Sequence, residues 1–588
     1  MGGRLEMHGV PPTIPWTKLG AHANQGTTSL TLMESVNWNI DDEIAIAPTD
    51  YFEAGNGISV SQMLTLTQVN GTQLTLNAGL NAHRWGLMQY ATNSGMSLSN
   101  AGLVTPPAPS GFTPTELDQR APIGNLTRNI VVQAPDDALW NSNGFGCHIM
   151  VMRMGANIPL CNDFPGCAHL DGVEIRRGGQ AGELGRYPFH WHMLSSDGTS
   201  ELGDATGQYI RNSSIHQSMN RGIVIHGTNG IEVSNNVLFD ITGHGIFTED
   251  AVERRNTIDG NLVMHVRNVA PANLLKHHEV GTFFGRGASG FWISNPDNII
   301  TNNTAADCGT NGFWLAFPEQ AWGANINFPI IPNRVSFGTF QNNTAHSNRL
   351  EGMILDFPEI NNTGEIFSRQ YMSTSDGQDP FITGNWEPLE RFQLESYNTW
   401  KNGHHGMWDR AVWADNWEIV SADNCGRFFA GSGADGLIER TLAIGTSLNH
   451  NMNGTGRPNF TGEVTPAAFA TYHSAFDIRD NIIIEFPAVV NTMSGAFGTD
   501  DYYIRPVEKG QLRNTNNLMI NSHPGVKLEA EFDYFSLAGA LWDPNGTWGG
   551  STDEWLVYDE TFFTHGQTPT TVPPGAATGG VLVEGPFF

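Results

Sequence analysis

The chain has 588 residues, of which 39% are hydrophobic and 67 are glycine, and this length suits a long repetitive fold or several domains. Lysine and arginine together number 30 against 59 aspartates and glutamates, so the formal net charge is −29. This acidity disfavours nucleic acids and anionic membranes as partners, and no apolar run is long enough to cross a membrane.

The N-terminal part, residues 1–130, is rich in short runs that favour β-strands. Asn70-Gly71 separates two alternating runs in MLTLTQVNGTQLTLNAG, which indicates a β-hairpin with a tight turn. The proline-rich stretch 103–124 is expected to be a connecting loop. The first residues, MGGRLEMHGV, lack the charged and apolar regions of a signal peptide. We therefore predict an N-terminal β-rich domain and expect no signal peptide in this sequence.

Residues 131–440 carry short β-prone runs that begin with glycine and share one frame. The repeated glycines are Gly222, Gly245, Gly290, Gly312 and Gly352. Their spacings include 23, 22 and 40 residues, and a period near 22 with longer insertions is typical of a parallel β-helix. Asparagine-rich turns lie between the runs, where stacked asparagine side chains can hydrogen-bond from coil to coil. The alternative is another all-β fold with chance glycine spacing.

The fold expected from these runs is all-β: a right-handed parallel β-helix that follows the N-terminal β-rich domain. Residues 131–440 are predicted to form the β-helix that carries the functional site. In residues 441–588 the runs persist more weakly, and the tail is rich in proline and glycine. We expect further coils there, followed by a C-terminal region of strands and loops.

Three neighbouring runs place polar side chains at the same offset. They read Phe189-His190-Trp191-His192, Ile223-Val224-Ile225-His226 and Ile246-Phe247-Thr248-Glu249. Side chains alternate faces along a strand, and neighbouring strands lie about 4.8 Å apart. His192, His226 and Glu249 are therefore predicted to form a column, with Asp250 at the following turn to orient a histidine or an arginine. These four are candidate catalytic residues, and Asp356 continues the column as a candidate substrate-binding residue.

The same frame predicts an aromatic row beside the column. Phe247, Trp292 and Trp314 share the outer face of three successive coils. Flat apolar rings in register can stack against the sugar rings of a polysaccharide. The alternative is that a covering loop buries them, because an exposed tryptophan is unfavourable without a partner. The three residues are candidate substrate-binding residues.

A divalent metal ion is a further candidate ligand. His190 and His192 project from one face of one run, and His226 lies one coil further along. Three imidazoles at that spacing can bind Zn²⁺ or a similar ion, with Glu249 as fourth ligand or base. Two alternatives remain open: histidines that only brace the coil through hydrogen bonds, and a metal-free acid/base pair.

The chemistry of the column fits two reactions on a polysaccharide. Glycoside hydrolysis needs a proton donor and a carboxylate that activates water or attacks carbon, and Glu249 is the better-placed carboxylate. A uronate-directed lyase would use His192 or His226 as the base, with an arginine or a cation to neutralise the uronate carboxylate. Arg186 is the candidate catalytic arginine and Arg221 a candidate substrate-binding arginine, although ordinary surface ion pairing is the alternative for both.

Several long segments resemble a known family and occur in the same order. They are GRYPFHWH, GHGIFTEDAVERRNTID, FWISNPDNIITNN, NGFWLAF and AHSNRLEGMILD. The resemblance is to the cell-migration-inducing hyaluronan-binding protein, the cell-surface transmembrane hyaluronidase and the fibrocystin-like proteins, and it runs from residue 2 to about residue 430. The N-terminal part is similar to the second half of the glycine-rich extracellular domain that precedes the β-helix in that family.

The resemblance implies an extracellular β-helix protein that faces polysaccharide, in a family where some members depolymerise hyaluronan and others have no established activity. We expect a secreted glycoside hydrolase of the hyaluronidase type that cleaves an acidic, uronate-containing glycan internally. A uronate-directed lyase is the first alternative, and a non-catalytic carbohydrate-binding or adhesion protein is the second. The high acidity suggests a bacterial relative in an extracellular or saline setting.

Overall fold

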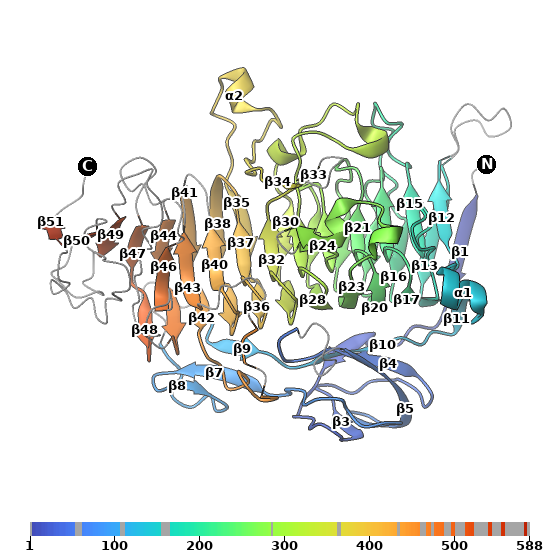
Figure 1. Cartoon of the computed structure of the whole chain (residues 1–588), viewed down its shortest axis with the longest axis horizontal. Helices are drawn as coiled ribbons and strands as arrows, with labels where there is room; N and C mark the ends of the chain where they lie inside the picture. The colour runs from blue at the N-terminus through green and yellow to red at the C-terminus, as the bar shows by residue number, and fades with distance from the viewer. Residues whose placement is uncertain are drawn as a thin grey trace. The chain divides into compact units, whose positions relative to one another are not determined.

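The computed structural model divides the chain into two compact units (Figure 1). It describes residues 3–52, 61–105, 112–153, 165–283, 286–360, 366–431, 435–454, 456–458, 466–471, 476–486, 495–499, 512–522, 539–543, 554–558 and 581–584. Unit 1 comprises Met1–Leu87 with Arg120–Glu390, and unit 2 comprises Met88–Gln119 with Arg391–Phe588. The three domains expected from the sequence remain a prediction. None of the helices in the described residues has the length and apolar character that a membrane crossing requires.

Unit 1 contains three parallel sheets whose strands follow one another in turn along the chain, so each coil adds one strand to each sheet. The first sheet contains β1 (Arg4–His8), β13 (Cys167–Asp171), β16 (Tyr209–Arg211), β19 (Glu232–Ser234), β22 (Thr257–Asp259), β27 (Ile299–Thr301) and β30 (Thr339–Gln341). The second contains β11 (Ile130–Gln133), β14 (Val173–Arg176), β17 (Ser214–Ser218), β20 (Val237–Thr242), β23 (Leu262–Arg267), β28 (Thr304–Cys308) and β31 (Thr344–His346). The third contains β12 (Ile149–Met152), β15 (Phe189–His192), β18 (Ile223–His226), β21 (Ile246–Thr248), β26 (Phe291–Ile293), β29 (Phe313–Leu315) and β32 (Met353–Leu355). The predicted fold, an all-β right-handed parallel β-helix, is confirmed.

Unit 2 repeats the three-sheet pattern. Its first sheet contains β35 (Phe392–Glu395), β38 (Trp413–Trp417), β41 (Asp435–Glu439), β44 (Phe476–Arg479), β47 (Leu512–Thr515), β49 (Gly539–Asp543), β50 (Glu554–Tyr558) and β51 (Val581–Glu584). The last two of these strands pair antiparallel, whereas the others pair parallel. Its second contains β36 (Asn398–Trp400), β39 (Val420–Ala422), β42 (Leu442–Ile444), β45 (Ile482–Ile484) and β48 (Leu518–Ile520), and its third contains β37 (Met407–Asp409), β40 (Arg427–Gly431), β43 (Ala467–Thr471) and β46 (Gly495–Thr499). A small antiparallel sheet of β8 (Gly95–Ser97), β7 (Met88–Thr92) and β9 (Glu116–Asp118) belongs to the same unit.

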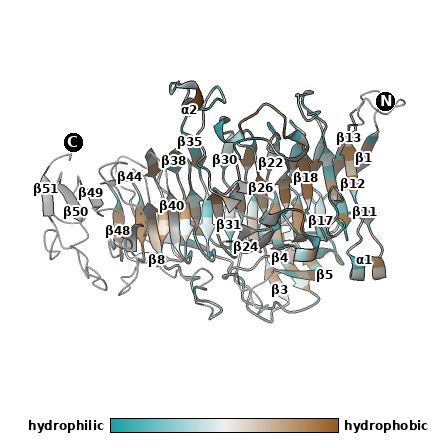
Figure 2. Cartoon of the chain, turned by 45° about the horizontal axis from the view of Figure 1, so that its top comes forward, coloured by the Kyte–Doolittle hydropathy of each residue, from teal (hydrophilic) through white to brown (hydrophobic). Residues whose placement is uncertain are grey.

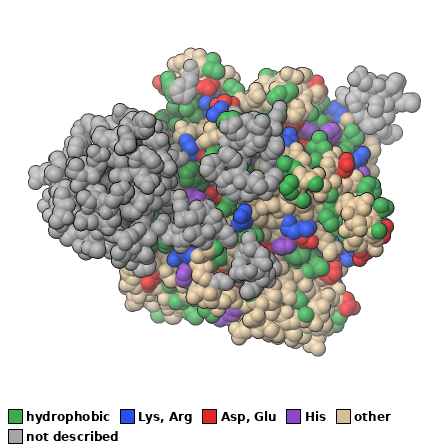
Figure 3. All heavy atoms as spheres, viewed as in Figure 1, with side chains coloured by type: hydrophobic (Ala, Val, Ile, Leu, Met, Phe, Trp, Pro, Cys, Tyr) green, Lys and Arg blue, Asp and Glu red, His purple; other side chains and the backbone are tan. Residues whose placement is uncertain are grey.

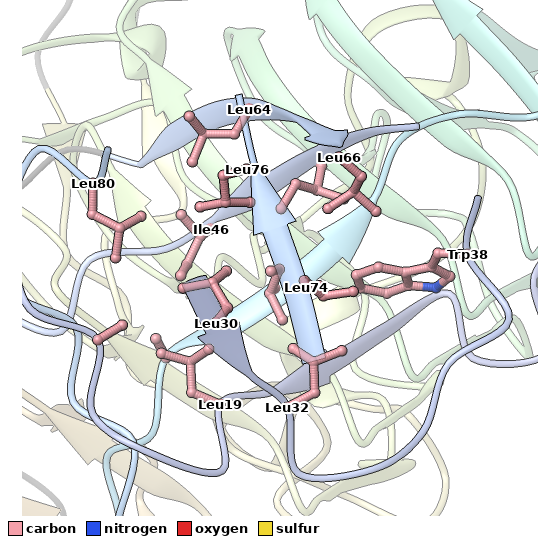
Figure 4. Close-up of a cluster of buried hydrophobic side chains, with 14 of the residues drawn as sticks. Leu19, Leu30, Leu32, Trp38, Ile46, Leu64, Leu66, Leu74, Leu76 and Leu80 are labelled. Atoms are coloured by element: carbon pink, nitrogen blue, oxygen red, sulfur yellow. The ribbon is translucent and has the colours of Figure 1, made fainter. Parts of the chain in front are cut away.

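The N-terminal part of unit 1 adds a separate antiparallel sheet with its own apolar core (Figure 4). Its strands, in spatial order, are β2 (Trp16–Lys18), β10 (Pro122–Asn125), β4 (Glu43–Ile46), β5 (Gln62–Asn70), β6 (Gln73–Leu76) and β3 (Ser29–Thr31). The hairpin predicted at Asn70-Gly71 is confirmed: Asn70 faces Gln73, and Gly71 has a φ of 61°, a conformation that glycine adopts without strain. The core depends on leucines from β3, β5 and β6 that converge on one another in Figure 4.

The glycine frame has a steric cause in the third sheet of unit 1. A Cβ on Gly245 would lie 2.5 Å from the carbonyl oxygen of Gly290, and a Cβ on Gly290 would lie 2.8 Å from that of Gly312. The same applies to Gly312 and Gly352, at 2.6 Å. Each coil therefore needs glycine where the backbone of the next coil approaches it. The next residues point inward: Phe291 and Phe313 stack with ring centroids 4.6 Å apart, and the strands carry the brown apolar stretches of Figure 2.

A ladder of asparagine side chains joins the coils of unit 1. The side-chain oxygen of Asn303 accepts from the backbone and side-chain nitrogens of Asn261, both at 3.0 Å. The Nδ2 of Asn303 donates to Ile258 O at 2.8 Å and to Asn343 Oδ1 at 3.1 Å. The asparagine before it, Asn302, has a φ of 58°. The predicted stacking of asparagines at the turns is confirmed, and it satisfies polar groups that are fully buried.

Replacing Asn303 with alanine is expected to lower the free energy of unfolding by about 3 kcal/mol, because several buried groups lose partners at about 1–3 kcal/mol each. Urea denaturation followed by tryptophan fluorescence measures the change. Gln341→Ala is the matched control, since this half-buried side chain lies on β30 of the same unit. Equal denaturation midpoints for the two variants would contradict a structural role for the ladder.

Two insertions between strands lie against the third sheet of unit 1, and a third insertion follows β32. Residues 268–290 contain η1 (Pro271–Asn273), η2 (His277–Glu279), β24 (Val280–Phe283) and β25 (Arg286–Gly287). Residues 316–338 contain η3 (Gly323–Asn325) and η4 (Pro332–Arg334), and the connection after β32 contains β33 (Glu359–Ile360), β34 (Ile366–Phe367) and α2 (Pro380–Thr383). A short helix, α1 (Ala138–Asn143), precedes β12. The first two insertions supply residues to the site described next.

Candidate functional site

The predicted polar column forms at the ends of three adjacent strands of the third sheet. His192 of β15 is the register partner of His226 of β18. The next strand pairs Ile225 with Thr248, and Glu249 then donates its backbone N–H to Ile225 O at 3.0 Å. Glu249 therefore follows His226 by one coil, as the common frame of the three runs requires.

Four side chains bring their polar atoms together in this column. The Nδ1 atoms of His192 and His226 lie 3.0 Å apart. The Oε2 of Glu249 lies 3.5 Å from the Nδ1 of His226 and 4.0 Å from the Nε2 of His190. One ligand atom from each of the three histidines lies within 4.8 Å of the others. The three imidazoles can therefore reach a common point, and the carboxylate borders it.

Two polar atoms of this cluster are buried without a hydrogen-bond partner in the described part of the chain: His190 Nε2 and Glu249 Oε2. Such atoms are rare in folded proteins, because each loses its hydration without compensation. His190 is 1% exposed and Glu249 is 8% exposed, whereas His192 is only half-buried. The cluster thus meets solvent chiefly at His192.

Neighbouring groups fix the histidine rings. The Nδ1 of His190 lies 3.2 Å from Gly185 O, and a carbonyl can only accept, so Nδ1 carries the proton and Nε2 is free. The Nε2 of His226 lies 2.7 Å from Asp250 Oδ2, which leaves Nδ1 facing the cluster. Asp250 is itself held by Asn325 of η3, which donates from its backbone N at 3.2 Å and its Nδ2 at 3.1 Å. Asp250 orients a histidine, as the sequence suggested.

The surroundings of the cluster raise the pKa of His226 and lower the pKa values of His192 and His190. Burial lowers the pKa of His226, but the negative charges of Glu249 and Asp250 outweigh it and raise the pKa to about 9. Burial and the neighbouring His226 lower the pKa of His192 to about 4. The same two causes hold the pKa of His190 well below its usual value.

A second carboxylate, Glu253, supports the turn that carries Asp250. Its Oε1 accepts from Gly227 N at 2.8 Å and from Asp250 N at 3.1 Å. Burial and the charge of Asp250 raise the pKa of Glu253 to about 7. Burial also raises the pKa of Asp250, but the hydrogen bond from His226 outweighs this effect and lowers it.

Arg221 lies beneath the cluster rather than on the surface. It is fully buried, and its Nη1 lies 3.5 Å from Glu249 Oε1 and 3.3 Å from the Tyr187 hydroxyl. Its Nε donates to Glu279 of η2, and its guanidinium lies 3.9 Å from the ring centroid of Phe247. Burial lowers the pKa of Arg221, but the charge of Glu279 and its other neighbours raises it beyond its usual value. Arg221 therefore holds Glu249 by one oxygen and leaves Oε2 to the cluster.

Comparison with known proteins identifies the part of the chain that carries this site. Residues 144–353 match the family described as CEMIP beta-helix. They belong to the CEMIP β-helix family. Cell surface hyaluronidase CEMIP2 of Homo sapiens is 29% identical over 384 residues, which are 59% of this chain and 27% of that protein. Cell migration-inducing and hyaluronan-binding protein of Mus musculus is 28% identical over 477 residues, 74% of this chain and 32% of that protein.

Fibrocystin-L of Homo sapiens is a third relative, 30% identical over 443 residues, 71% of this chain and 9% of that protein. The family predicted from the sequence is thus confirmed, and the chain spans less than a third of the length of each of these relatives. Among solved structures, the catalytic unit of an α-1,3-glucanase from Streptomyces thermodiastaticus covers 89% of this chain and 98% of its own, with 8% identity and a TM-score of 0.25. With a TM-score this low, the comparison supports no conclusion about the chemistry of this chain.

The aromatic row of this β-helix is buried, which is the alternative to the predicted sugar platform. Phe247 is 1% exposed, and Trp292 and Trp314 are 0% exposed. His278 of η2 stacks on Trp292 with ring centroids 4.1 Å apart, and the Nε1 of Trp314 donates to Asp356 O at 2.9 Å. A fully buried ring offers no face to a sugar, so the predicted sugar platform is corrected to a packing layer between the third sheet and its insertions.

The other predicted substrate contacts also need correction. Arg221 and Asp356 are buried, and the carboxylate of Asp356 accepts from Ser368 at 2.7 Å, so neither presents its charge to a polymer. Arg186, the candidate catalytic arginine, is exposed and lies 2.8 Å from His148, and its role stays a prediction. On the face shown in Figure 3, the Lys and Arg side chains of the described residues lie apart rather than in a continuous basic patch.

Four residues of the site were not predicted from the sequence: Tyr187, Glu253, Glu279 and Asn325. Glu253 had a usable signal, because Glu249, Asp250 and Glu253 occur close together in TEDAVE. Tyr187 lies just before β15, where the frame could have been extended. Glu279 and Asn325 come from insertions whose path over the sheet no local pattern specifies.

Proposed function

We propose that this chain is an extracellular enzyme that hydrolyses an acidic, uronate-containing polysaccharide at internal bonds. The observation that carries the proposal is the cluster of His190, His192, His226 and Glu249. Two of its buried polar atoms, on His190 and Glu249, have no hydrogen-bond partner among the described residues, and the half-buried His192 connects the cluster to solvent. Perturbed, partly exposed ionisable groups of this kind are typical of catalytic sites. Relatives named as a hyaluronidase and as a hyaluronan-binding protein support the substrate class.

In this proposal Glu249 is the carboxylate that hydrolysis requires, and Arg221, with its Nη1 3.5 Å from Oε1, keeps it oriented. His226 lies 3.5 Å from Glu249 and is held on its other side by Asp250, so it completes the acid/base group. His192 is the half-buried member through which the cluster meets the polymer. Arg186 is exposed next to Gly185 and is assigned to pair with a uronate carboxylate.

A uronate-directed lyase is the second candidate, because the half-buried His192 stands where a base can reach the proton next to a uronate carboxylate. The exposed Arg186 would then neutralise that carboxylate. The two reactions give different products: elimination creates a double bond that absorbs ultraviolet light, and hydrolysis does not.

Incubation of the purified chain with hyaluronan, and with neutral dextran as the control polymer, tests the proposal. We expect hyaluronan or another uronate polymer to shorten rapidly on size-exclusion chromatography, with new reducing ends and no ultraviolet-absorbing product. Absorbing products would assign the lyase reaction instead. Binding without shortening of any acidic polymer would contradict an enzyme and leave a carbohydrate-binding protein.

A further inference from the structure

We infer that His190, His192, His226 and Glu249 form a binding site for one divalent transition-metal ion of the Zn²⁺ type. The ligand atoms assigned by the geometry are Nε2 of His190, Nδ1 of His192, Nδ1 of His226 and Oε2 of Glu249. The inference concerns metal binding alone, and it stands whether or not the chain cleaves a polysaccharide.

The separations of these atoms suit one small ion. Two ligands at about 2.0–2.1 Å from a tetrahedral zinc ion lie about 3.3 Å apart. The Nδ1 atoms of His192 and His226 are 3.0 Å apart, and Glu249 Oε2 is 3.5 Å from one of them and 4.0 Å from His190 Nε2. Small ring rotations bring all four into a common coordination sphere.

Hydrogen bonding within the cluster cannot satisfy all of these atoms. A bond between the Nδ1 atoms of His192 and His226 would use one N–H and one lone pair, and it would leave His190 Nε2 and Glu249 Oε2 without partners. Each buried polar atom left in this way costs about 1–3 kcal/mol. A single cation can accept lone pairs from His190 Nε2, from Glu249 Oε2 and from the Nδ1 atoms of the other two histidines. With the ion bound, none of these four atoms lacks a partner. This argument favours a metal site over histidines that merely brace the coil.

The groups behind the histidines are those that a metal site needs. A ligating imidazole usually donates its other ring N–H to a carbonyl or carboxylate, which fixes the free nitrogen toward the ion. His190 does so to Gly185 O at 3.2 Å, and His226 does so to Asp250 Oδ2 at 2.7 Å. Asn325 and Glu253 in turn hold Asp250 and its turn. The rings are thus oriented toward one point before an ion arrives.

The donor set also selects the class of ion. Imidazole nitrogens suit Zn²⁺, Co²⁺, Ni²⁺ and related ions, whereas Ca²⁺ and Mg²⁺ prefer shells of oxygen atoms. An ion held here would lie beside the half-buried His192, on the side from which solvent and a polymer approach.

Metal titration of the full chain tests the inference. After removal of bound ions, the protein is equilibrated with Zn²⁺ or Co²⁺, its metal content is measured by mass spectrometry, and the visible spectrum of the Co²⁺ form is recorded. We expect about one equivalent of metal per chain and a Co²⁺ spectrum typical of a four-coordinate ion with nitrogen and oxygen ligands. The variants His192→Ala and Glu249→Gln are expected to bind at least about a hundred-fold more weakly, and Asp250→Asn, which only orients His226, about ten-fold more weakly.

His169→Ala is the matched control, since this histidine lies on β13 of the same unit and bonds to Glu6 outside the cluster. It should keep the metal and the spectrum of the unaltered chain. His192→Ala removes the half-buried histidine and so disturbs packing least, and circular dichroism shows whether each variant is folded. A folded wild-type chain that takes up no Zn²⁺ or Co²⁺, or equal uptake by wild type, His192→Ala and Glu249→Gln, would overturn the inference.

Discussion

Glu249→Gln is expected to lower the initial rate of polysaccharide cleavage by at least about a hundred-fold, the range that acid/base groups contribute. The amide has nearly the same shape but carries no negative charge, so it can neither exchange a proton nor stabilise positive charge in the cluster. The measurement is the rate of reducing-end formation from the uronate polymer that the unaltered chain cleaves. The thermal midpoint should change little, because Arg221 keeps its partner Glu279.

Glu232→Gln is the control for that experiment. Glu232 is half-buried on β19, in the first sheet and away from the cluster, and this variant should keep the full rate. A folded Glu249→Gln variant with the rate of Glu232→Gln would remove Glu249 from the mechanism and with it the proposed site.

Arg221→Ala is expected to lower the free energy of unfolding by about 3–5 kcal/mol, because breaking a buried ion pair leaves an uncompensated charge in the protein interior. Arg221 is fully buried between Glu249 and Glu279. Both carboxylates would lose their cation, and the guanidinium would no longer fill the space over the ring of Phe247. Denaturant unfolding followed by tryptophan fluorescence measures the loss.

Arg211→Ala is the matched control, since Arg211 pairs with Asp171 at 2.9 Å where both side chains are partly exposed. A pair of that kind contributes at most about 1 kcal/mol. In the double variant Arg221→Ala/Glu279→Gln part of the loss should be recovered, because one of the two unpaired charges is gone. Equal losses for Arg221→Ala and Arg211→Ala would contradict the view that a buried charge network supports the site.

The sequence predicted the column correctly because a β-helix repeats one backbone geometry. Strand pairing in register follows from the glycine that precedes each run, and alternation then sends His192, His226 and the residues beside them to one side. Glu249 could be placed because it follows Phe247 by two residues, and side chains two residues apart lie on the same face of a strand. The asparagine ladder was predictable for the same reason, since each asparagine follows a turn residue in a left-handed conformation.

What alternation leaves open is whether an outer face meets solvent or protein. Phe247, Trp292 and Trp314 were correctly placed in one row, yet the insertion 268–290 covers them, with His278 stacked on Trp292. The charged state of Arg221 was evident from its type, but its burial depends on Glu279 from that same insertion. Local patterns specify the direction of a side chain within its own strand and say nothing about the path of a distant loop.

The sequence by itself determined the all-β solenoid, the register of its third sheet and the row of His192, His226 and Glu249, because each follows from short repeats and the period of a strand. Only the tertiary structure decided which of these groups are buried, that Asn325 holds the carboxylate of Asp250 against His226, and that Arg221 lies under Glu249. Those contacts join residues far apart in the chain, and burial and charge pairing depend on the whole packed structure rather than on any local pattern.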